Sequence, residues 1–260
     1  PAKSVRTEGF VEKVEGNLYT TRRGFSLICD RMAEVLLKAG AEIRLNAKVA
    51  GLEREGARVT AVLLSNGERL SCSAIVNTLA INEAPLLLKP SLGPEVEAAS
   101  RKLRFRAIVF VGLKIRRSHV LPASFVYFRE HSFNRVTDLS YFKLQMDPPG
   151  STLLVAEIAC DPADAVWSDD AAAKEAVLKD LERESLIKRD EVLGSVVFRT
   201  RHGQPMYTLG FEGALKTVID AMEGLANAVT AGRQGRFQYV NTHVAMKMGR
   251  EAADRLRAKL

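Results

Sequence analysis

The chain has 260 residues, of which 47% are hydrophobic and 27% are charged. This length and balance indicate a soluble globular protein with one large or two small domains, and they exclude a disordered or coiled-coil chain. No run approaches the ~20 apolar residues of a membrane-spanning helix, and the N-terminus lacks the apolar core of a secretory signal. The three cysteines are scattered without a Cys-x-x-Cys pair, so we expect a cytoplasmic location and no disulfides.

The formal net charge of +7 is concentrated in one segment. Residues 101–117 carry seven cationic side chains and no acid. Read with a period of two, residues 105–115 form a strand with one apolar face, and the other face begins with Arg104 and Arg106. Two interpretations stay open, a solvated strand with charged ends and an arginine-lined wall for an anionic substrate. Nucleic-acid binding is not expected, because no aromatic residues interleave with the basic ones in a base-stacking pattern.

The first third of the chain predicts an α/β arrangement. Apolar residues recur at helical spacing over residues 26–39, and Gly40 supplies a left-handed stop. Short strands follow, with Glu-Gly at 55–56 and Asn-Gly at 66–67 as turn signals. The expected strands are 42–46, 49–54, 59–65 and 74–78.

The middle of the chain predicts an antiparallel sheet. Three prolines interrupt residues 84–94, where we place a domain crossing. Between residues 101 and 201 strands with short connections dominate, and one helix over 170–186 covers the sheet. A second helix is expected over 211–225. The expected strands of this sheet are 105–115, 124–128, 135–138, 152–160 and 192–200.

Common catalytic motifs are absent from the sequence. It has no Gly-x-Gly-x-x-Gly, P-loop or Gly-x-Ser-x-Gly, and its four histidines are isolated, so no metal site is expected. The strongest local signal is a short strand over 227–231 that enters a turn from Gly232 to Gly235 and then a helix over 242–258. Glycine permits close backbone approach to a ligand, and a helix N-terminus offers free N–H donors. A tightly packed glycine turn and a cofactor cradle fit these residues equally.

Two segments carry a family resemblance. The first is Tyr-Thr-Thr-Arg-Arg-Gly-Phe at 19–25, followed by the helix and Gly-Ala-Glu-Ile-Arg-Leu-Asn-Ala-Lys-Val at 40–49. The second is Asn-Ala-Val-Thr-Ala-Gly-Arg-Gln-Gly-Arg-Phe-Gln-Tyr-Val-Asn at 227–241, followed by a helix with small residues. In order and spacing they resemble the superfamily of FAD-dependent amine oxidases, protoporphyrinogen oxidases, phytoene desaturases and UDP-galactopyranose mutases.

The resemblance implies a fold and a domain division. The fold class is α/β (α+β), with later segments of an FAD-binding Rossmann-type domain and an antiparallel-sheet substrate domain with covering helices. The partial FAD-binding domain would comprise residues 1–84 and 224–260, and the substrate-binding domain residues 85–223.

The resemblance also implies site residues. Val49 resembles the position whose backbone meets the adenine, and Gly232 and Arg233 match the pair beside the pyrophosphate and ribityl chain. The start of the last helix would face the pyrimidine edge of the flavin, where a helix dipole stabilises the anionic reduced form. No catalytic residue is assigned. The implied FAD-binding residues are Val49, Asn77, Thr78, Gly232, Arg233, Gly235, Asn241, Thr242, His243 and Val244. The expected substrate-binding residues are Arg104, Arg106 and Tyr207.

The sequence departs from the family pattern at three points. Amine oxidases usually carry Gly-Glu where this chain has Gly232-Arg233, and a pair of aromatic residues around the amine is not evident. Amine oxidation is therefore not expected, and a porphyrinogen or a nucleotide sugar suits the arginine-rich strand better. The family's Gly-x-Gly-x-x-Gly unit, its main pyrophosphate site, is missing. We therefore expect this chain to be the C-terminal part of a longer flavoprotein, incomplete and inactive alone.

These observations lead to one expected function and two alternatives. The expected function is that of an FAD-dependent oxidoreductase, which oxidises an anionic organic small molecule by hydride transfer to flavin. The first alternative is a UDP-galactopyranose mutase-like isomerase, in which reduced flavin acts as a nucleophile without net redox change. The second is a non-catalytic anion-binding domain on a relic flavoprotein scaffold.

Overall fold

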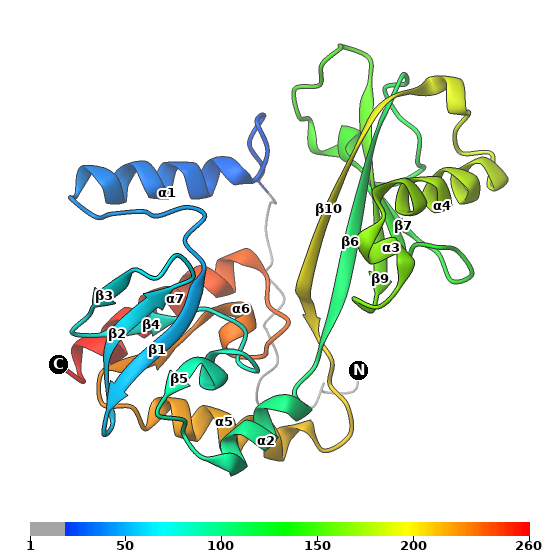
Figure 1. Ribbon diagram of the computed structural model, residues 1–260. Helices are drawn as coiled ribbons and strands as arrows, with labels where there is room; N and C mark the ends of the chain where they lie inside the picture. The colour runs from blue at the N-terminus through cyan, green and yellow to red at the C-terminus, as the bar shows by residue number, and fades with distance from the viewer. Residues whose placement is uncertain (1–18) are drawn as a thin grey trace, which may run out of the picture.

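The computed structural model describes residues 19–260, which form two lobes joined by a pair of neighbouring strands (Figure 1). The first lobe contains the helices and strands before residue 104 and after residue 206. The second lobe lies between those two points of the chain. No helix in the described residues is long and apolar enough to cross a membrane.

The first lobe begins with α1 (Ser26–Lys38), which confirms the expected helix. None of its side chains is buried. Gly40 follows at a φ of +85°, the left-handed conformation expected of a helix stop. The expected strand at 42–46 is wrong, because Asn46 adopts a left-handed φ of +57° that breaks an extended path, and no described strand pairs with this segment.

A four-stranded sheet with the order β3-β2-β1-β5 forms the body of the first lobe. The hairpin turns at Gly56, whose φ is +56°, as the Glu-Gly signal predicts. β3 was not expected, and it adds to β2 after the Asn-Gly turn. The strands are β1 (Val49–Glu55), β2 (Arg58–Leu64), β3 (Arg69–Ser71) and β5 (Leu88–Lys89), with β5 parallel to β1.

A second, two-stranded sheet pairs segments from the two ends of the chain. β4 (Ile75–Asn77) and β11 (Ala228–Thr230) run parallel, with Asn77 opposite Thr230. Their carboxyl ends therefore meet at one edge.

Two helices close the core of the first lobe. α2 (Pro94–Lys102) was not expected, and α5 (Phe211–Glu223) confirms the helix expected over 211–225. The core that they share with β1 and β2 includes Leu52, Val59, Val96, Ala99, Val218 and Met222. The division expected at residues 84/85 and 223/224 assigns α2 and α5 to the substrate-binding domain. In the structure, the side chains of both helices pack in the core of the first lobe.

The second lobe is built on a five-stranded sheet with the order β10-β6-β9-β8-β7. Every neighbouring pair is antiparallel, which confirms the expected sheet. β10 runs on to Pro205, beyond the expected end at residue 200. The strands are β6 (Phe105–Ile115), β7 (Phe125–Tyr127), β8 (Arg135–Asp138), β9 (Thr152–Cys160) and β10 (Val192–Pro205).

The two faces of this sheet differ. On one face Val109, Val111 and Leu113 are completely buried beneath α4 (Asp170–Arg183), which α3 (Ala165–Ser168) precedes. The opposite face is turned towards the first lobe (Figure 1). The period-two pattern of residues 105–115 is therefore confirmed.

The chain ends in α6 (Gly232–Gly235) and α7 (Thr242–Arg257), and α7 confirms the expected last helix. Short 3₁₀ turns occupy Ala84–Leu87, Leu139–Phe142 and Arg189–Glu191.

Candidate functional site

The carboxyl ends of β4 and β11 form a rim, which is the first part of the candidate site. The buried Asn77 side chain donates a hydrogen bond to Thr230 Oγ1 at 3.2 Å and accepts one from the Leu79 amide at 3.1 Å. The Ala231 amide donates to the Asn77 carbonyl at 2.9 Å. These bonds hold the two strand ends together, so Thr78 and Gly232 leave the sheet at the same edge. Ligands of parallel α/β sheets bind outside such carboxyl ends.

Two glycines at this rim are required for different reasons. Gly232 has a φ of +81°, and no heavy atom lies within 4 Å of the position that a Cβ would take. Gly235 is buried, and a Cβ there would lie 2.9 Å from Thr230 Oγ1 and 3.2 Å from the Asn77 carbonyl. Gly232 thus leaves open space at the rim, whereas Gly235 allows close packing of the turn on the strands.

The N-terminus of α7 lies on the same connection. Asn241 precedes the helix without a capping side-chain hydrogen bond. Asn241, Thr242 and His243 are exposed, and Val244 is half-buried. The first amides of this helix are free to donate to a ligand. The structure thus brings Asn77, Thr78 and residues 232–244 onto connected strand ends and turns, while Val49 lies at the start of β1 in the other sheet.

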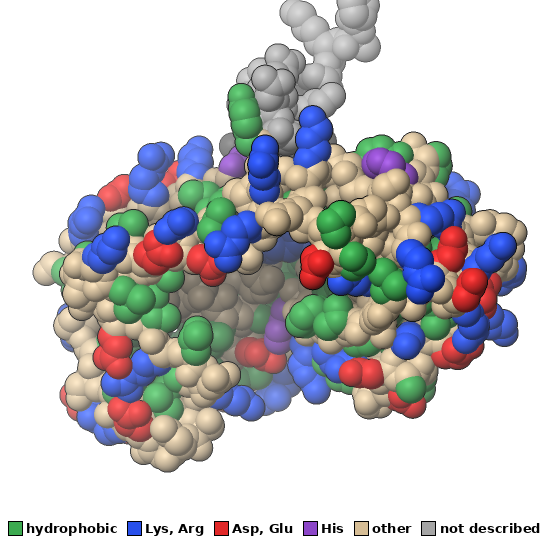
Figure 2. Space-filling view, turned by 90° about the horizontal axis from the view of Figure 1, so that it is seen from above, with side chains coloured by type: hydrophobic (Ala, Val, Ile, Leu, Met, Phe, Trp, Pro, Cys, Tyr) green, Lys and Arg blue, Asp and Glu red, His purple; other side chains and the backbone are tan. Residues whose placement is uncertain are grey.

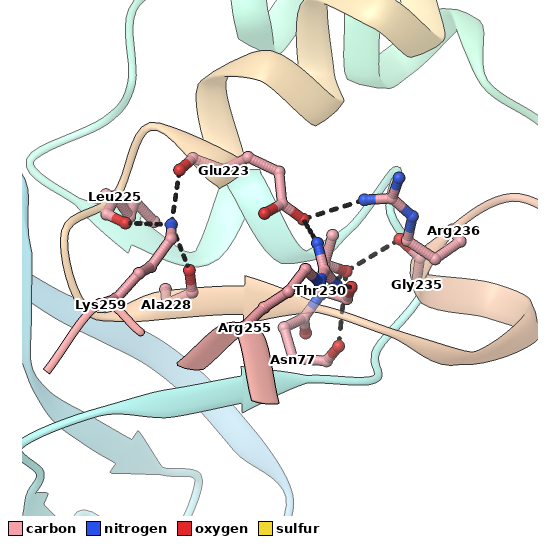
Figure 3. A network of polar contacts seen from close by, with 9 residues as sticks. All are labelled: Asn77, Glu223, Leu225, Ala228, Thr230, Gly235, Arg236, Arg255 and Lys259. Carbon is pink, nitrogen blue, oxygen red and sulfur yellow. Dashed lines mark hydrogen bonds and ion pairs between the residues drawn. The ribbon is translucent and has the colours of Figure 1, made fainter. Parts of the chain in front are cut away.

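A polar network holds α7 against the rest of the lobe (Figure 3). Glu223 Oε1 accepts hydrogen bonds from Arg236 and Arg255, each at 2.9 Å. Lys259 Nζ donates to the carbonyl oxygens of Glu223, Leu225 and Ala228 at 2.6–2.9 Å. Burial lowers the pKa of Arg236, although the Glu223 carboxylate opposes that shift. The network connects the end of α5 to β11 and to the C-terminal end of α7, and so anchors that end of the helix.

The second part of the site is a groove between the lobes. Two adjoining cavities of about 390 and 350 Å³ share a wall on the open face of the five-stranded sheet. The loop 233–241 supplies the opposite wall. We call this space the interlobe groove, and Figure 2 shows the molecule hollowed between its two lobes. The two cavities share Ile108, Arg135, Glu157, Gln204 and Tyr239.

Arg233 attaches this loop to the sheet. Its guanidinium donates to the Val240 carbonyl at 3.1 Å and to the Gly203 carbonyl at 2.9 Å. The same group lies 4.0 Å from the centroid of the Tyr239 ring, within the range of a cation–π contact. The residue expected beside the pyrophosphate therefore also fixes the wall of the interlobe groove.

The expected substrate-binding residues separate in the structure. Arg106 is half-buried and lines the groove, and its side chain has no hydrogen-bond or carboxylate partner among residues 19–260. Arg104 is 63% exposed, lies 3.7 Å from Asp161 and is not part of the lining. Tyr207 lies behind the loop, where its hydroxyl accepts from the Tyr239 amide at 2.9 Å.

A pair of opposite charges in the same groove was not predicted from the sequence. Arg135 Nε donates to Glu157 Oε1 at 2.9 Å, and the Tyr127 hydroxyl lies 3.5 Å from the guanidinium. Burial would lower the pKa of Arg135, but the hydrogen bond and charge of Glu157 outweigh it and raise that pKa. The pair forms because Arg135 and Glu157 face each other on β8 and β9. The alternation of side chains along each strand places both residues on the open face. It does not specify the register of β8 against β9 that brings them opposite each other.

Metal ligands do not gather in the described residues, where no group of three or more His, Cys, Asp or Glu side chains could hold an ion. With its arginines, amides and tyrosines, the interlobe groove is suited to hold an anion beside the rim.

The profile of a family described as flavin-containing amine oxidoreductases matches residues 3–257. No curated protein matches the chain.

Three solved structures illustrate the likeness of fold. A reduced UDP-galactopyranose mutase is 17% identical with a TM-score of 0.77 over 93% of this chain and 52% of its own. A variant of putrescine oxidase is 18% identical with a TM-score of 0.67 over 91% and 53%. A protein from an Exiguobacterium species, described as a protoporphyrinogen oxidase, is 21% identical with a TM-score of 0.64 over 83% and 47%. The chain thus spans about half the length of these solved structures.

Proposed function

Because the chain belongs to the family of flavin-containing amine oxidoreductases, we propose that it supplies the later part of an FAD site and the substrate lobe of an oxidoreductase. The observation that carries this proposal is the rim, where two parallel strand ends, Gly232 and the start of α7 meet. We propose that residues 1–84 and 224–260 belong to the cofactor-binding part and that residues 85–223 belong to the substrate-binding part. The free cysteines Cys29, Cys72 and Cys160 suit the cytoplasm as the proposed location.

The residues of the rim fit a dinucleotide. The open position at Gly232 accepts a group that a side chain there would exclude. The uncapped amides at the start of α7 and the positive end of its dipole suit an electron-rich ring edge or a phosphate. When bound, FAD supplies the acceptor for a hydride from the substrate. Val49, Asn77 and Thr78 complete the proposed contacts.

The proposed substrate is an anionic organic small molecule in the interlobe groove. Arg106 offers a guanidinium without a carboxylate partner in the described chain. The acidic residue on the same wall, Glu157, is paired with Arg135. The loop 233–241 forms part of the groove and of the rim, so a molecule in the groove lies beside the proposed cofactor. Tyr207 supports this wall through the Tyr239 amide. Arg104 would add only a distant, solvent-screened charge.

A mutase-like isomerisation is the second candidate. Gly232-Arg233 stands where amine oxidases usually carry Gly-Glu, and the mutase fold superimposes with a TM-score of 0.77. A uridine nucleotide would then occupy the groove. Tight binding of uridine diphosphate favours the mutase, whereas bleaching of bound flavin by an organic donor favours the oxidoreductase.

The FAD proposal is tested by titrating FAD into the chain and following flavin fluorescence. We expect weak binding and a colourless purified chain, because the sequence contains no Gly-x-Gly-x-x-Gly unit. We expect Gly232→Val to weaken FAD binding at least about tenfold, since the side chain fills the open position and a φ of +81° is strained for valine.

The matched control is Gly249→Ala on α7, where no heavy atom lies within 4 Å of the new Cβ. This variant should bind FAD as the parent does, and gain about 1 kcal/mol of helix stability. Unchanged FAD affinity in folded Gly232→Val protein, or no FAD binding at all by the parent chain, would refute the proposed site. The latter result would favour a relic scaffold.

A further inference from the structure

The open face of the five-stranded sheet extends beyond the interlobe groove. On β6, Val109 and Val111 point to the α4 side, so Ile108 and Phe110 point to the open side. Strand pairing extends this assignment across the sheet. Phe198, Phe110, Glu157, Arg135 and Tyr127 form one row over the five strands. Val196, Gly112, Val155, Thr137 and Phe125 form the next row.

Apolar side chains dominate these two rows, and four of the six are exposed. Phe198 is 65% exposed and Tyr127 67%, while Phe125 and Val196 are 46% and 42% exposed. Contiguous apolar surface of this kind marks a binding site more often than isolated exposed residues do. We call this surface the open-face patch; it consists of Phe110, Phe125, Tyr127, Val155, Val196 and Phe198.

The open-face patch is continuous with the interlobe groove. Phe110 and Tyr127 belong to both, and the Arg135–Glu157 pair lies between them in the same row. The Arg135 guanidinium lies 5.8 Å from the ring centroids of Phe125 and Tyr127, so these rings gather around the charge. Polar donors thus lie next to the rim, and apolar side chains lie farther along the strands.

We propose that the substrate is an amphipathic anion, with its charged group at Arg106 in the groove and its apolar body on the open-face patch. The inference rests on the proposed function, which places the substrate in this groove. Continuity of groove and patch, with Arg106 unpaired among the described residues at the groove end, favours a single molecule that carries both chemistries. Five strands at ~4.8 Å spacing present a surface about 19 Å wide, enough for an extended chain or a large planar ring system.

The test compares decyl phosphate, kept below its critical micelle concentration, with ethyl phosphate by isothermal titration calorimetry. Each buried methylene strengthens binding about fourfold, so burial of four of them makes decyl phosphate bind at least about 100-fold more tightly. In the double variant Phe125→Ser/Phe198→Ser, the ratio of the ethyl phosphate to the decyl phosphate dissociation constant should fall at least about tenfold. Arg106→Gln should weaken both ligands. Leu209→Ser, which alters a fully exposed leucine outside the patch, is the matched control and should change neither.

Three results would overturn the inference. If decyl phosphate binds no more tightly than ethyl phosphate, the open-face patch does not contact the alkyl chain. Self-association that the double variant abolishes would assign the patch to a second copy, and binding to anionic vesicles without binding of dissolved decyl phosphate would assign it to a membrane surface. FAD titration of the same samples separates this failure from that of the proposed function, because a chain that binds FAD but shows no chain-length preference refutes the amphipathic substrate alone.

Discussion

The two faces of the five-stranded sheet use the same strands in opposite ways. The α4 face is closed, and its Val109, Val111 and Leu113 are completely buried. The open face carries cationic, amide and aromatic side chains next to the loop 233–241. Stability and binding are thus assigned to alternate residues of one strand, so single substitutions on β6 can separate the two.

The largest effect is expected on the closed face. Leu113→Ala should lower the free energy of unfolding by about 2–5 kcal/mol, because it leaves a cavity in a fully packed core. Phe198→Ala, on the neighbouring strand but exposed on the open face, should cost at most about 1 kcal/mol. Urea denaturation of both variants measures the difference, and equal losses would contradict the division between the faces.

A smaller, pH-dependent effect is expected at Asp138, a buried carboxylate among the apolar residues of the second lobe. Burial would raise its pKa, but hydrogen bonds from Thr152, Ser140 and the amides of residues 120 and 121 outweigh it and lower that pKa. Asp138→Asn should therefore cost about 1–3 kcal/mol at pH 7. The Asp138 carboxylate stabilises the fold above its unfolded pKa of about 3.9, and this contribution is lost as the pH falls through the lower folded value.

Urea titrations from pH 7 to pH 3 check this sign. The difference in unfolding free energy between parent and Asp138→Asn should narrow below about pH 4. A difference that stays constant over this range would show that the charge of Asp138 has no part in stability.

On the open face we expect loss of binding without loss of stability. Arg106→Gln should weaken ethyl phosphate binding about tenfold or more, as expected for one charge-assisted contact of ~1.5–3 kcal/mol. Arg104→Gln is the matched variant. Its affinity for ethyl phosphate should stay within about twofold of the parent value, because Arg104 is exposed and lies outside the groove. Calorimetry compares the two variants, and equal weakening would mean that binding depends on the total charge of the segment rather than on a contact in the groove.

Local patterns predicted much of this fold. The alternation of residues 105–115 correctly separated the two faces of β6. Helical spacing with the Gly40 stop located α1, and the strand–turn–helix pattern located α7. The glycine turn at 232–235 also lies where the strand-to-helix pattern placed it. These features depend on residues close in sequence, so the sequence alone carries the information.

Features set by long-range packing were missed. α2 begins at Pro94, the last proline of the segment interpreted as a domain crossing. Pro94, together with Glu95 and Glu97 in the first turn, is a helix-start signal that this interpretation left unused. The proposed groove needs Arg106 of β6, Arg135 of β8 and Tyr239 of the last loop to meet. Their meeting depends on strand register and on the packing of two lobes, which no local pattern specifies.

The second lobe enters and leaves the first at one point. Phe105 and Pro205 are opposite each other at the ends of β6 and β10, and the Met206 amide donates to the Arg104 carbonyl at 2.8 Å. Because the two ends are adjacent, a short turn could connect them in place of the intervening segment, at the loss of the hydrogen bond from Arg233 to the Gly203 carbonyl. A lineage with this architecture can exchange the inserted sheet in a single recombination event while it inherits the first lobe.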